Sequence, residues 1–429
     1  MAAPKVDVEE RPPLLKSIPL SLQHLFAMFG ATVLVPYLVG LDTSVTLLSS
    51  GVGTLLYIVV TKGKVPAYLG SSFAFIGALT VLLAVKPGQL ADARHVSAAM
   101  GGCVVVGVIY ILVALAIHRF GTGWIDKLLP PVVIGSVVVV IGLGLARVAV
   151  DMATGAAVGG YDRTSFLVAL TALAIAIAAA AFLRGFLGVI PILIGIVGGY
   201  LVALALGRVD FSPVAHARAF AVPRLVLPTF GWPAVLALAP ISLVVITEHI
   251  GHLIVTNKVC ERDFFREPGL HRSLAGDGVA TAVAGMMGGP PNTTYGENIG
   301  VMAITRVFSV WVIGGAAVIA IVMSFIPKVG TFIHTIPVPV MGGICILLFG
   351  IIGSQGVRML VEAGIDFSQK RNLIIASVIL VIGIGGAHVE VGGVTFSEMP
   401  LATYAGILLN LILPRSKGLE GPAAAEPDV

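Results

Sequence analysis

The chain has 429 residues, of which 57% are hydrophobic and 11% are charged, and its mean hydropathy is +1.02. A soluble domain carries about 25% charged residues, so this composition excludes a water-facing globular protein and also a disordered one. The net charge of +4 does not indicate a nucleic-acid partner, because the basic residues stand singly in short loops, as membrane topology requires. Three scattered cysteines exclude a disulfide scaffold. We expect an all-α polytopic membrane protein in a lipid bilayer, with no cofactor and no metal.

Apolar segments recur along the whole chain, and a helix of about 20 such residues can cross a bilayer. The segments near 67–84 and 293–305 are poor candidates for continuous helices. We predict fourteen transmembrane segments in all, near residues 17–40, 43–61, 67–84, 96–118, 128–149, 165–183, 186–206, 233–255, 271–288, 293–305, 307–326, 336–356, 372–387 and 400–414.

The distribution of Lys and Arg orients these segments. If the N-terminus is cytoplasmic, most of the 26 Lys and Arg residues fall in cytoplasmic loops. We therefore expect both termini on the cytoplasmic side, with tails at 1–16 and 415–429 and a long external loop at 211–232. The C-terminal tail is rich in Pro, Ala and Glu, a composition that predicts disorder.

The two halves of the chain resemble each other weakly. The segments around Pro131 and Pro339 share their spacing of Pro, Val and Gly, which indicates either duplication or chance similarity among apolar residues. An odd number of spans per half inverts the second copy in the membrane, a layout common in secondary transporters. We predict two inverted repeats of seven spans, at 17–210 and 233–414.

Each half also contains one irregular apolar segment, at 66–73 and at 288–298. These segments are rich in Pro, Gly, Ser, Thr and Asn, which are poor formers of helix interiors. We expect spans 3 and 10 to be broken, each beginning with a short extended stretch and becoming helical partway across. Extended backbone at this depth must be buried or line a cavity, so the two segments should meet at a binding site. Ordinary surface loops are the alternative.

One apolar span, 241–255, contains Glu248, His249 and His252. A charged residue at the centre of a span costs about 2.5–3.5 kcal/mol to insert and therefore needs a partner or a function. Glu248 and His252 are four residues apart, share a helix face and could store or pass a proton. A buried Glu–His pair that only ties helices together is the alternative. A zinc site is disfavoured, because the glutamate precedes both histidines.

Glu297 lies where the second irregular segment should become helical, so free N–H groups would favour its ionised form. Helix capping is the alternative reason for an acid here. His24, in the first span, is expected to be a hydrogen-bonded packing residue. Carboxylates accept hydrogen bonds and free backbone N–H groups donate them, so the complementary ligand is a small, planar, neutral oxo-base such as uracil or xanthine.

Several segments match a known family. The run Glu297–Arg306 fits the signature of the nucleobase–ascorbate transporter (nucleobase:cation symporter) family, [Q/E/P]-N-x-G-x-x-x-x-T-[R/K/G]. Further segments closely resemble bacterial members of that family that transport uracil: 19–30, 70–75, 248–252 and 291–306. The resemblance extends from about residue 11 to about residue 414.

This resemblance implies a core domain (spans 1–4 and 8–11), a gate domain (spans 5–7 and 12–14) and usually a homodimer. It also implies proton-coupled uracil import across the bacterial inner membrane by alternating access. Carboxylates of Glu248 and Glu297 and backbone amides of Phe73 and Gly296 would bind the base, while Glu248 and His252 would couple the proton. The implied supporting residues are Tyr295, Ser72, Asn298, His24 and Phe349. Phe349 is a departure, because relatives carry a tyrosine there.

Alternatives remain for the function. Xanthine or another nucleobase could replace uracil, and sodium could replace the proton. An anion exchanger of similar architecture is disfavoured, because Glu248 and Glu297 would repel an anion. A passive channel is a further alternative, which a substrate gradient driven by pH would exclude. An intramembrane enzyme is disfavoured because neither a nucleophile–base pairing nor an ordered metal triplet was found in the sequence. We therefore predict a transporter rather than an enzyme.

Overall fold

The computed structural model describes residues 6–157, 159–391, 394–396 and 398–414 of this chain. Most of them are helical. The helices of the first half are α1 (Leu14–Val39), α2 (Thr43–Val60), α3 (Ile76–Leu83), α4 (Ala93–Phe120), α5 (Gly123–Leu128), α6 (Pro131–Leu143), α7 (Ala146–Thr154), α8 (Arg163–Phe182), α9 (Pro191–Ala205) and α10 (Ser212–His216), with the 3-10 turns η1 (Phe73–Phe75) and η2 (Gly185–Val189).

The second half repeats this helical character. Its helices are α11 (Trp232–Cys260), α12 (Leu270–Met287), α13 (Gly296–Thr305), α14 (Val310–Ser324), α15 (Pro327–His334), α16 (Val338–Glu362), α17 (Lys370–Ile384) and α18 (Glu398–Ile412), with the turn η3 (Phe265–Gly269). Four short strands are present in the described residues: β1 (Leu69–Ser71), β2 (Asn292–Thr294), β3 (Val389–Val391) and β4 (Val394–Phe396).

Local sequence signals fix several helix ends. Helix α1 ends at Gly40, which adopts the left-handed conformation (φ +75°) that glycine reaches without strain. Asp42 then caps α2, accepting hydrogen bonds from Ser44 N at 2.7 Å and Val45 N at 3.3 Å. Helix α6 begins with Pro131, whose missing N–H needs no partner at the first helical position.

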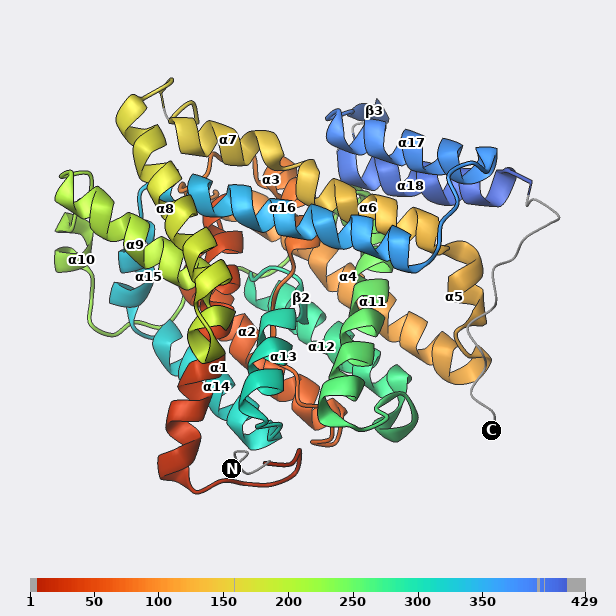
Figure 1. The fold of residues 1–429 in the computed structure, drawn as a ribbon, viewed down its shortest axis with the longest axis horizontal. Coiled ribbons are helices and arrows are strands. Elements are labelled where there is room, and N and C mark those ends of the chain that lie inside the picture. Colours follow the sequence, from red (N-terminus) through yellow and green to blue (C-terminus); the bar gives the residue numbers. More distant parts are fainter. Residues whose placement is uncertain (1–5, 158, 392–393, 397, 415–429) are drawn as a thin grey trace.

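The helices form two groups that are assembled from both halves of the chain. In the first helix group, α1–α4 pack with α11–α14; in the second, α6–α9 pack with α16–α18. Figure 1 shows α6, α7, α16, α17 and α18 along the upper side of the view, with α1, α2, α12, α13 and α14 below them. Each group therefore brings together segments that are far apart in the sequence.

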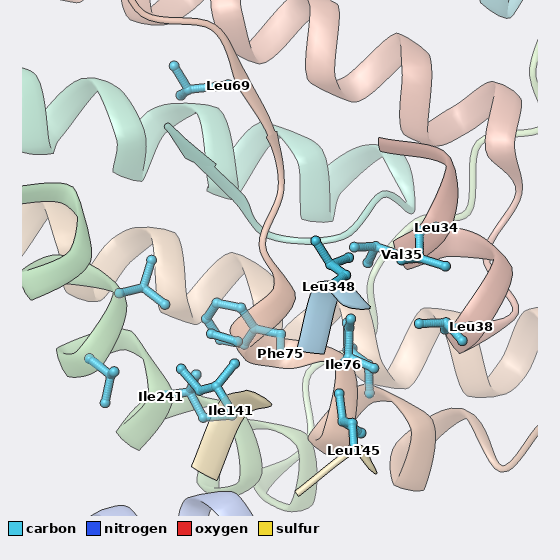
Figure 2. Packing of buried hydrophobic residues seen from close by; sticks show 14 of the residues in the cluster. Leu34, Val35, Leu38, Leu69, Phe75, Ile76, Ile141, Leu145, Ile241 and Leu348 are labelled. Atoms are coloured by element: carbon cyan, nitrogen blue, oxygen red, sulfur yellow. The ribbon is translucent and has the colours of Figure 1, made fainter. Parts of the chain in front are cut away.

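The two groups share one apolar core. Figure 2 shows Phe75, Ile76 and Ile241, from the first group, beside Ile141 and Leu348, from the second. The cluster to which they belong extends through α1, α4, α6, α11 and α16. Further contacts between the groups join α1 to α9, α13 to η2, and α3 to α18. The broken segments therefore lie close to the boundary between the groups.

Among the described residues, seven helical spans are long and apolar enough to cross a membrane, or eight if α14 and α15, bent by 84°, form one span. The seven are Leu14–Val39, Thr43–Val60, Ala93–Phe120, Pro131–Thr154, Arg163–Phe182, Trp232–Cys260 and Val338–Glu362. Other predicted segments correspond to shorter helices, such as α9 and α18. Fourteen spans in two inverted repeats therefore stay a prediction.

Three features of the fold add to the sequence prediction. The chain is not purely helical outside the broken spans, because β3 and β4 pair antiparallel, with Val389 opposite Phe396. The predicted external loop 211–232 contains the short helix α10. In the predicted N-terminal tail, residues 6–10 pack against the segment 306–310. The predicted C-terminal tail, 415–429, lies outside the described residues.

Candidate functional site

The two irregular segments meet, as their sequences predict. Strand β1 pairs antiparallel with β2, with Leu69 opposite Thr294 and Ser71 opposite Asn292. Two further backbone hydrogen bonds extend this pairing beyond the strands, from Ser72 N to Pro291 O at 2.9 Å and from Tyr295 N to Tyr68 O at 3.0 Å. The pairing satisfies backbone groups that would otherwise be left without partners in an apolar environment.

A threonine from a neighbouring helix binds the outer edge of each strand. Thr54 of α2 donates through Oγ1 to Leu69 O at 3.1 Å and accepts from Leu69 N at 2.9 Å. Thr281 of α12 does the same for Asn292, donating to its O at 3.0 Å and accepting from its N at 3.2 Å. A threonine hydroxyl thus binds both backbone groups of one strand residue in each half, and this similarity supports the predicted internal repeat.

Each strand leads directly into a helix. Phe73 begins η1 and Gly296 begins α13, with Glu297 in the first turn of α13. The first N–H groups of a helix have no intrahelical acceptor and carry the positive end of the helix dipole. Backbone N–H groups that can donate to a ligand therefore lie just after β1, at the start of η1, and just after β2, at the start of α13. The prediction that both segments enter extended and then become helical is confirmed.

The predicted binding residues are accessible, unlike most of their surroundings. Gly296 is exposed, and Phe73, Glu248, His252 and Glu297 are half-buried. Helix α11, which carries Glu248 and His252, packs against η1, β2 and α13. The structure thus brings η1 of the first predicted repeat together with α11, β2 and α13 of the second.

His252 contacts the second broken segment. Its Nδ1 shares a hydrogen bond of 3.0 Å with Thr294 Oγ1. Its Nε2 lies 3.5 Å from the position that a Cβ atom on Gly296 would occupy. No hydrogen bond or ion pair joins His252 to Glu248 in this structure, although both are described. The imidazole is therefore oriented by Thr294, with its other nitrogen facing the start of α13.

Tyr295 joins the second broken segment to the first. Its hydroxyl donates to Ser71 O at 3.1 Å and accepts from Thr32 Oγ1 at 3.3 Å. Its ring stacks on Tyr68, with ring centroids 6.5 Å apart. A Cβ atom at Gly70 would lie 2.5 Å from the Tyr295 ring, so only glycine permits this approach.

The remaining supporting residues are buried. Asn298 Nδ2 donates to His24 O at 3.0 Å and contacts His24 Nδ1 at 3.1 Å, so this pair ties α13 to α1. His24 is thus a hydrogen-bonded packing residue. Ser72 is fully buried and contributes its backbone N–H to the strand pairing. Phe349 is 2% exposed and lies in the shared apolar core, where α16 passes close to α6.

The sequence analysis missed one buried acid. Asp277 of α12 lies 3.0 Å from His249 Nδ1, and both side chains are completely buried. His249 Nε2 shares a 2.9 Å hydrogen bond with Ser273 Oγ, which shares a 2.6 Å bond with Tyr57 OH. A buried acid–histidine pair that ties helices together therefore exists, but it joins His249 to Asp277. The signal was available, because Asp277 lies inside the predicted span 271–288.

No metal site is evident from this geometry. Among the described residues, no three His, Cys, Asp or Glu side chains gather so that they could hold a metal ion. The site instead offers carboxylate acceptors on α11 and α13 and backbone donors at the starts of η1 and α13. This combination suits a neutral ligand with both N–H and C=O groups along one edge.

A comparison with protein families decides what kind of molecule this is. The model described as the Permease family (Xan_ur_permease) matches residues 15–392, which is most of the chain. The chain belongs to the Permease family. The sequence resemblance to nucleobase transporters is confirmed at this level. Permeases are transporters, so this chain is a multi-pass membrane transport protein and not an enzyme.

Relatives of this permease cover almost its whole length. The uracil permease of Bacillus caldolyticus is 53% identical over 421 residues, covering 96% of each chain. The uracil permease of Escherichia coli K12 is 50% identical over 409 residues, covering 95% of this permease and 93% of the relative. The transmembrane domain of the cyanobacterial bicarbonate transporter BicA superposes with a TM-score of 0.65 at 14% identity, covering 93% of this permease and 97% of that domain. That likeness establishes a shared fold.

Proposed function

We propose that this permease imports uracil together with protons by alternating access. The observation that carries the proposal is the pairing of β1 with β2, which places the helix starts at Phe73 and Gly296 near the accessible carboxylates of Glu248 and Glu297. The uracil permeases that share about half of its residues support the choice of base.

The chemistry of the site matches the edge of a uracil ring. Uracil presents alternating N–H and C=O groups, which need acceptors and donors in alternation. Glu248 and Glu297 supply acceptors for the ring N–H groups, while backbone N–H groups at Phe73 and Gly296 supply donors for the carbonyl oxygens. Hydrogen bonds to a charged group contribute about 1.5–3 kcal/mol each, enough to select an oxo-base over an apolar ring.

Proton coupling follows from the placement of charges. Glu248 and Glu297 lie on α11 and α13, which pack against each other, and two carboxylates near each other repel. A proton bound at Glu248 removes that repulsion, and His252, one turn away and oriented by Thr294, is placed to exchange it. Binding of the base and of the proton would then favour each other, which is the requirement for symport.

Alternating access needs two bodies that move relative to each other. We assign the first helix group (α1–α4 and α11–α14) as the core, which carries the site, and the second (α6–α9 and α16–α18) as the gate. Two of the contacts between them, α13–η2 and α3–α18, involve the helices that continue the broken segments. Rocking of the core against the gate would expose the site to each side in turn.

The topology, location and assembly remain part of the proposal. We propose fourteen spans with both termini cytoplasmic, in the bacterial inner membrane. The positive-inside distribution of Lys and Arg supports the orientation. The homodimer follows from the family resemblance. Xanthine is the second candidate substrate, since it presents a similar oxo-base edge.

Uptake of labelled uracil into proteoliposomes tests the proposal. With an inward proton gradient, wild-type protein should accumulate uracil, and a protonophore should abolish accumulation. Unlabelled uracil should compete better than xanthine, and a sodium gradient alone should not drive uptake. Empty liposomes and protein carrying Glu297→Gln are the controls. Accumulation that does not depend on the proton gradient would overturn proton coupling. Stronger inhibition by xanthine than by unlabelled uracil would overturn the choice of uracil as substrate.

A further inference from the structure

The N-terminal strap, which we define as residues 6–10, lies against the loop between α13 and α14. Figure 1 shows this segment at the end of the molecule where these two helices meet. The side chain of Val8 is completely buried. Three backbone hydrogen bonds hold the strap in place, from Val6 N to Arg306 O at 3.2 Å, from Phe308 N to Val6 O at 2.9 Å and from Val310 N to Val8 O at 2.9 Å.

An arginine from another helix end also holds the strap. Arg262 donates to Glu9 through both terminal nitrogens, at 2.8 Å each, and its Nη2 lies 3.0 Å from Asp7 Oδ2. Arg262 stands just beyond α11, whose last turn is closed by Glu261 in the left-handed conformation. Arg306 closes α13 in the same conformation. The strap therefore connects the ends of α11 and α13.

These are the two helices that carry the carboxylates of the site. Glu248 lies about 18 Å along α11 from its last residue, Cys260, at 1.5 Å per residue. Glu297 lies about 12 Å along α13 from its last residue, Thr305. Because a helix transmits a displacement of its end along its whole length, a clamp on both ends constrains the separation of the two acids.

We infer that Arg262 is a positioning residue: through the N-terminal strap it fixes α11 relative to α13 and so sets the spacing of Glu248 and Glu297 for the base. This inference rests on the proposed function, because it assigns the strap a role in uracil binding. It concerns a segment that contacts neither the base nor the proton.

The strap is a network and not an isolated surface pair. A single exposed ion pair contributes little, whereas a bidentate arginine shared by two carboxylates is stronger and directional. The guanidinium of Arg262 holds the pKa of Glu9 below its ordinary value of 4.5. The stability that Glu9 contributes is therefore present above pH 4.5 and is lost only as the pH falls through that lowered pKa. The clamp stays closed at the pH of transport.

Three variants of the full chain separate the clamp from the loss of a charge. Arg262→Gln removes the clamp. Arg266→Gln removes an equal charge from the same loop, and Arg266 is exposed and has no ion pair among the described residues. The triple variant Arg262→Glu, Glu9→Arg and Asp7→Asn reverses the main pair and restores it with opposite polarity.

Two measurements are made on each variant: uracil affinity in detergent at low and high salt, and amide hydrogen exchange at residues 6–10 and 306–310. We expect Arg262→Gln to weaken affinity about threefold to tenfold and to speed exchange in both segments. Wild-type affinity should fall with salt, whereas that of Arg262→Gln should not. Arg266→Gln should match wild type, and the triple variant should recover affinity.

The outcomes distinguish this inference from the proposed function. If wild type does not bind uracil, the proposed function and this inference both fail. If wild type binds and Arg262→Gln opens the strap with unchanged affinity, only the positioning role is overturned. Unchanged amide hydrogen exchange in Arg262→Gln would show that Arg262 does not hold the strap. If the triple variant does not recover uracil affinity, the ion pair itself is not the cause of the lost affinity.

Discussion

The buried pair of Asp277 and His249 gives the sharpest stability prediction. Both side chains are completely buried and lie 3.0 Å apart, so neither can recruit water if the other is removed. Breaking a buried pair by removing one partner costs about 3–5 kcal/mol, because the remaining group is left uncompensated. Asp277→Leu should therefore lower the thermal unfolding temperature strongly, and His249→Phe should do the same.

The double variant His249→Phe/Asp277→Leu should recover much of that loss. Replacing a buried pair by apolar residues of similar size is often neutral, and Ser273 would keep its hydrogen bond to Tyr57. Thermal unfolding of the purified protein in one detergent, followed for both single variants and the double, measures the coupling. Single variants that melt within about 1 °C of wild type, or a double variant that loses the sum of both, would refute this reasoning.

Three predictions concern the site itself. Glu297→Gln should weaken uracil binding about tenfold to a hundredfold without unfolding the protein, since the amide places a donor against a donor of the base; unchanged affinity would mean that Glu297 is only a cap. Glu248→Ala should abolish uptake driven by a proton gradient, and His252→Leu should impair accumulation more than equilibrium binding; full accumulation by both variants excludes them as the proton site. Phe349→Tyr should modestly raise affinity or shift the pH dependence of uptake, and superimposable affinity–pH curves would show that the missing hydroxyl plays no part.

Sequence patterns were informative where one physical constraint dominated. The irregular segments around Ser72 and Tyr295 could be placed because Pro, Gly and Asn inside an apolar run must break a helix. That β1 and β2 would meet followed from the need to satisfy extended backbone in an apolar environment. Glu248, His252 and Glu297 were found because an acid or imidazole is costly in such a span.

The same patterns did not predict which side chains contact each other. Sequence spacing put Glu248 and His252 on one face, but His252 bonds to Thr294, 42 residues further along the chain, a contact set by tertiary packing. His249, the residue next to Glu248 in the sequence, pairs with Asp277 on α12. Both partners are far away in the sequence, so local periodicity carries no information about them.

Hydrogen bonds from side chains to distant backbone groups could not be predicted from hydrophobic periodicity either. Thr54 and Thr281 look like ordinary small residues in apolar helices, and only the register of β1 and β2 reveals what their hydroxyls bind. The N-terminal strap was predicted to be part of a tail, because it precedes the first apolar segment. Its order comes from the partner segment at 306–310 and from Arg262.

The central claim, that uracil and a proton move together through this site, is tested most directly by proton movement. Proteoliposomes containing a pH-sensitive dye, with no gradient imposed, receive external uracil. Coupled import should acidify the interior, and Glu248→Ala protein should give no signal although uracil is present at the same concentration. Uracil entry that leaves the internal pH unchanged in wild-type proteoliposomes would contradict the claim.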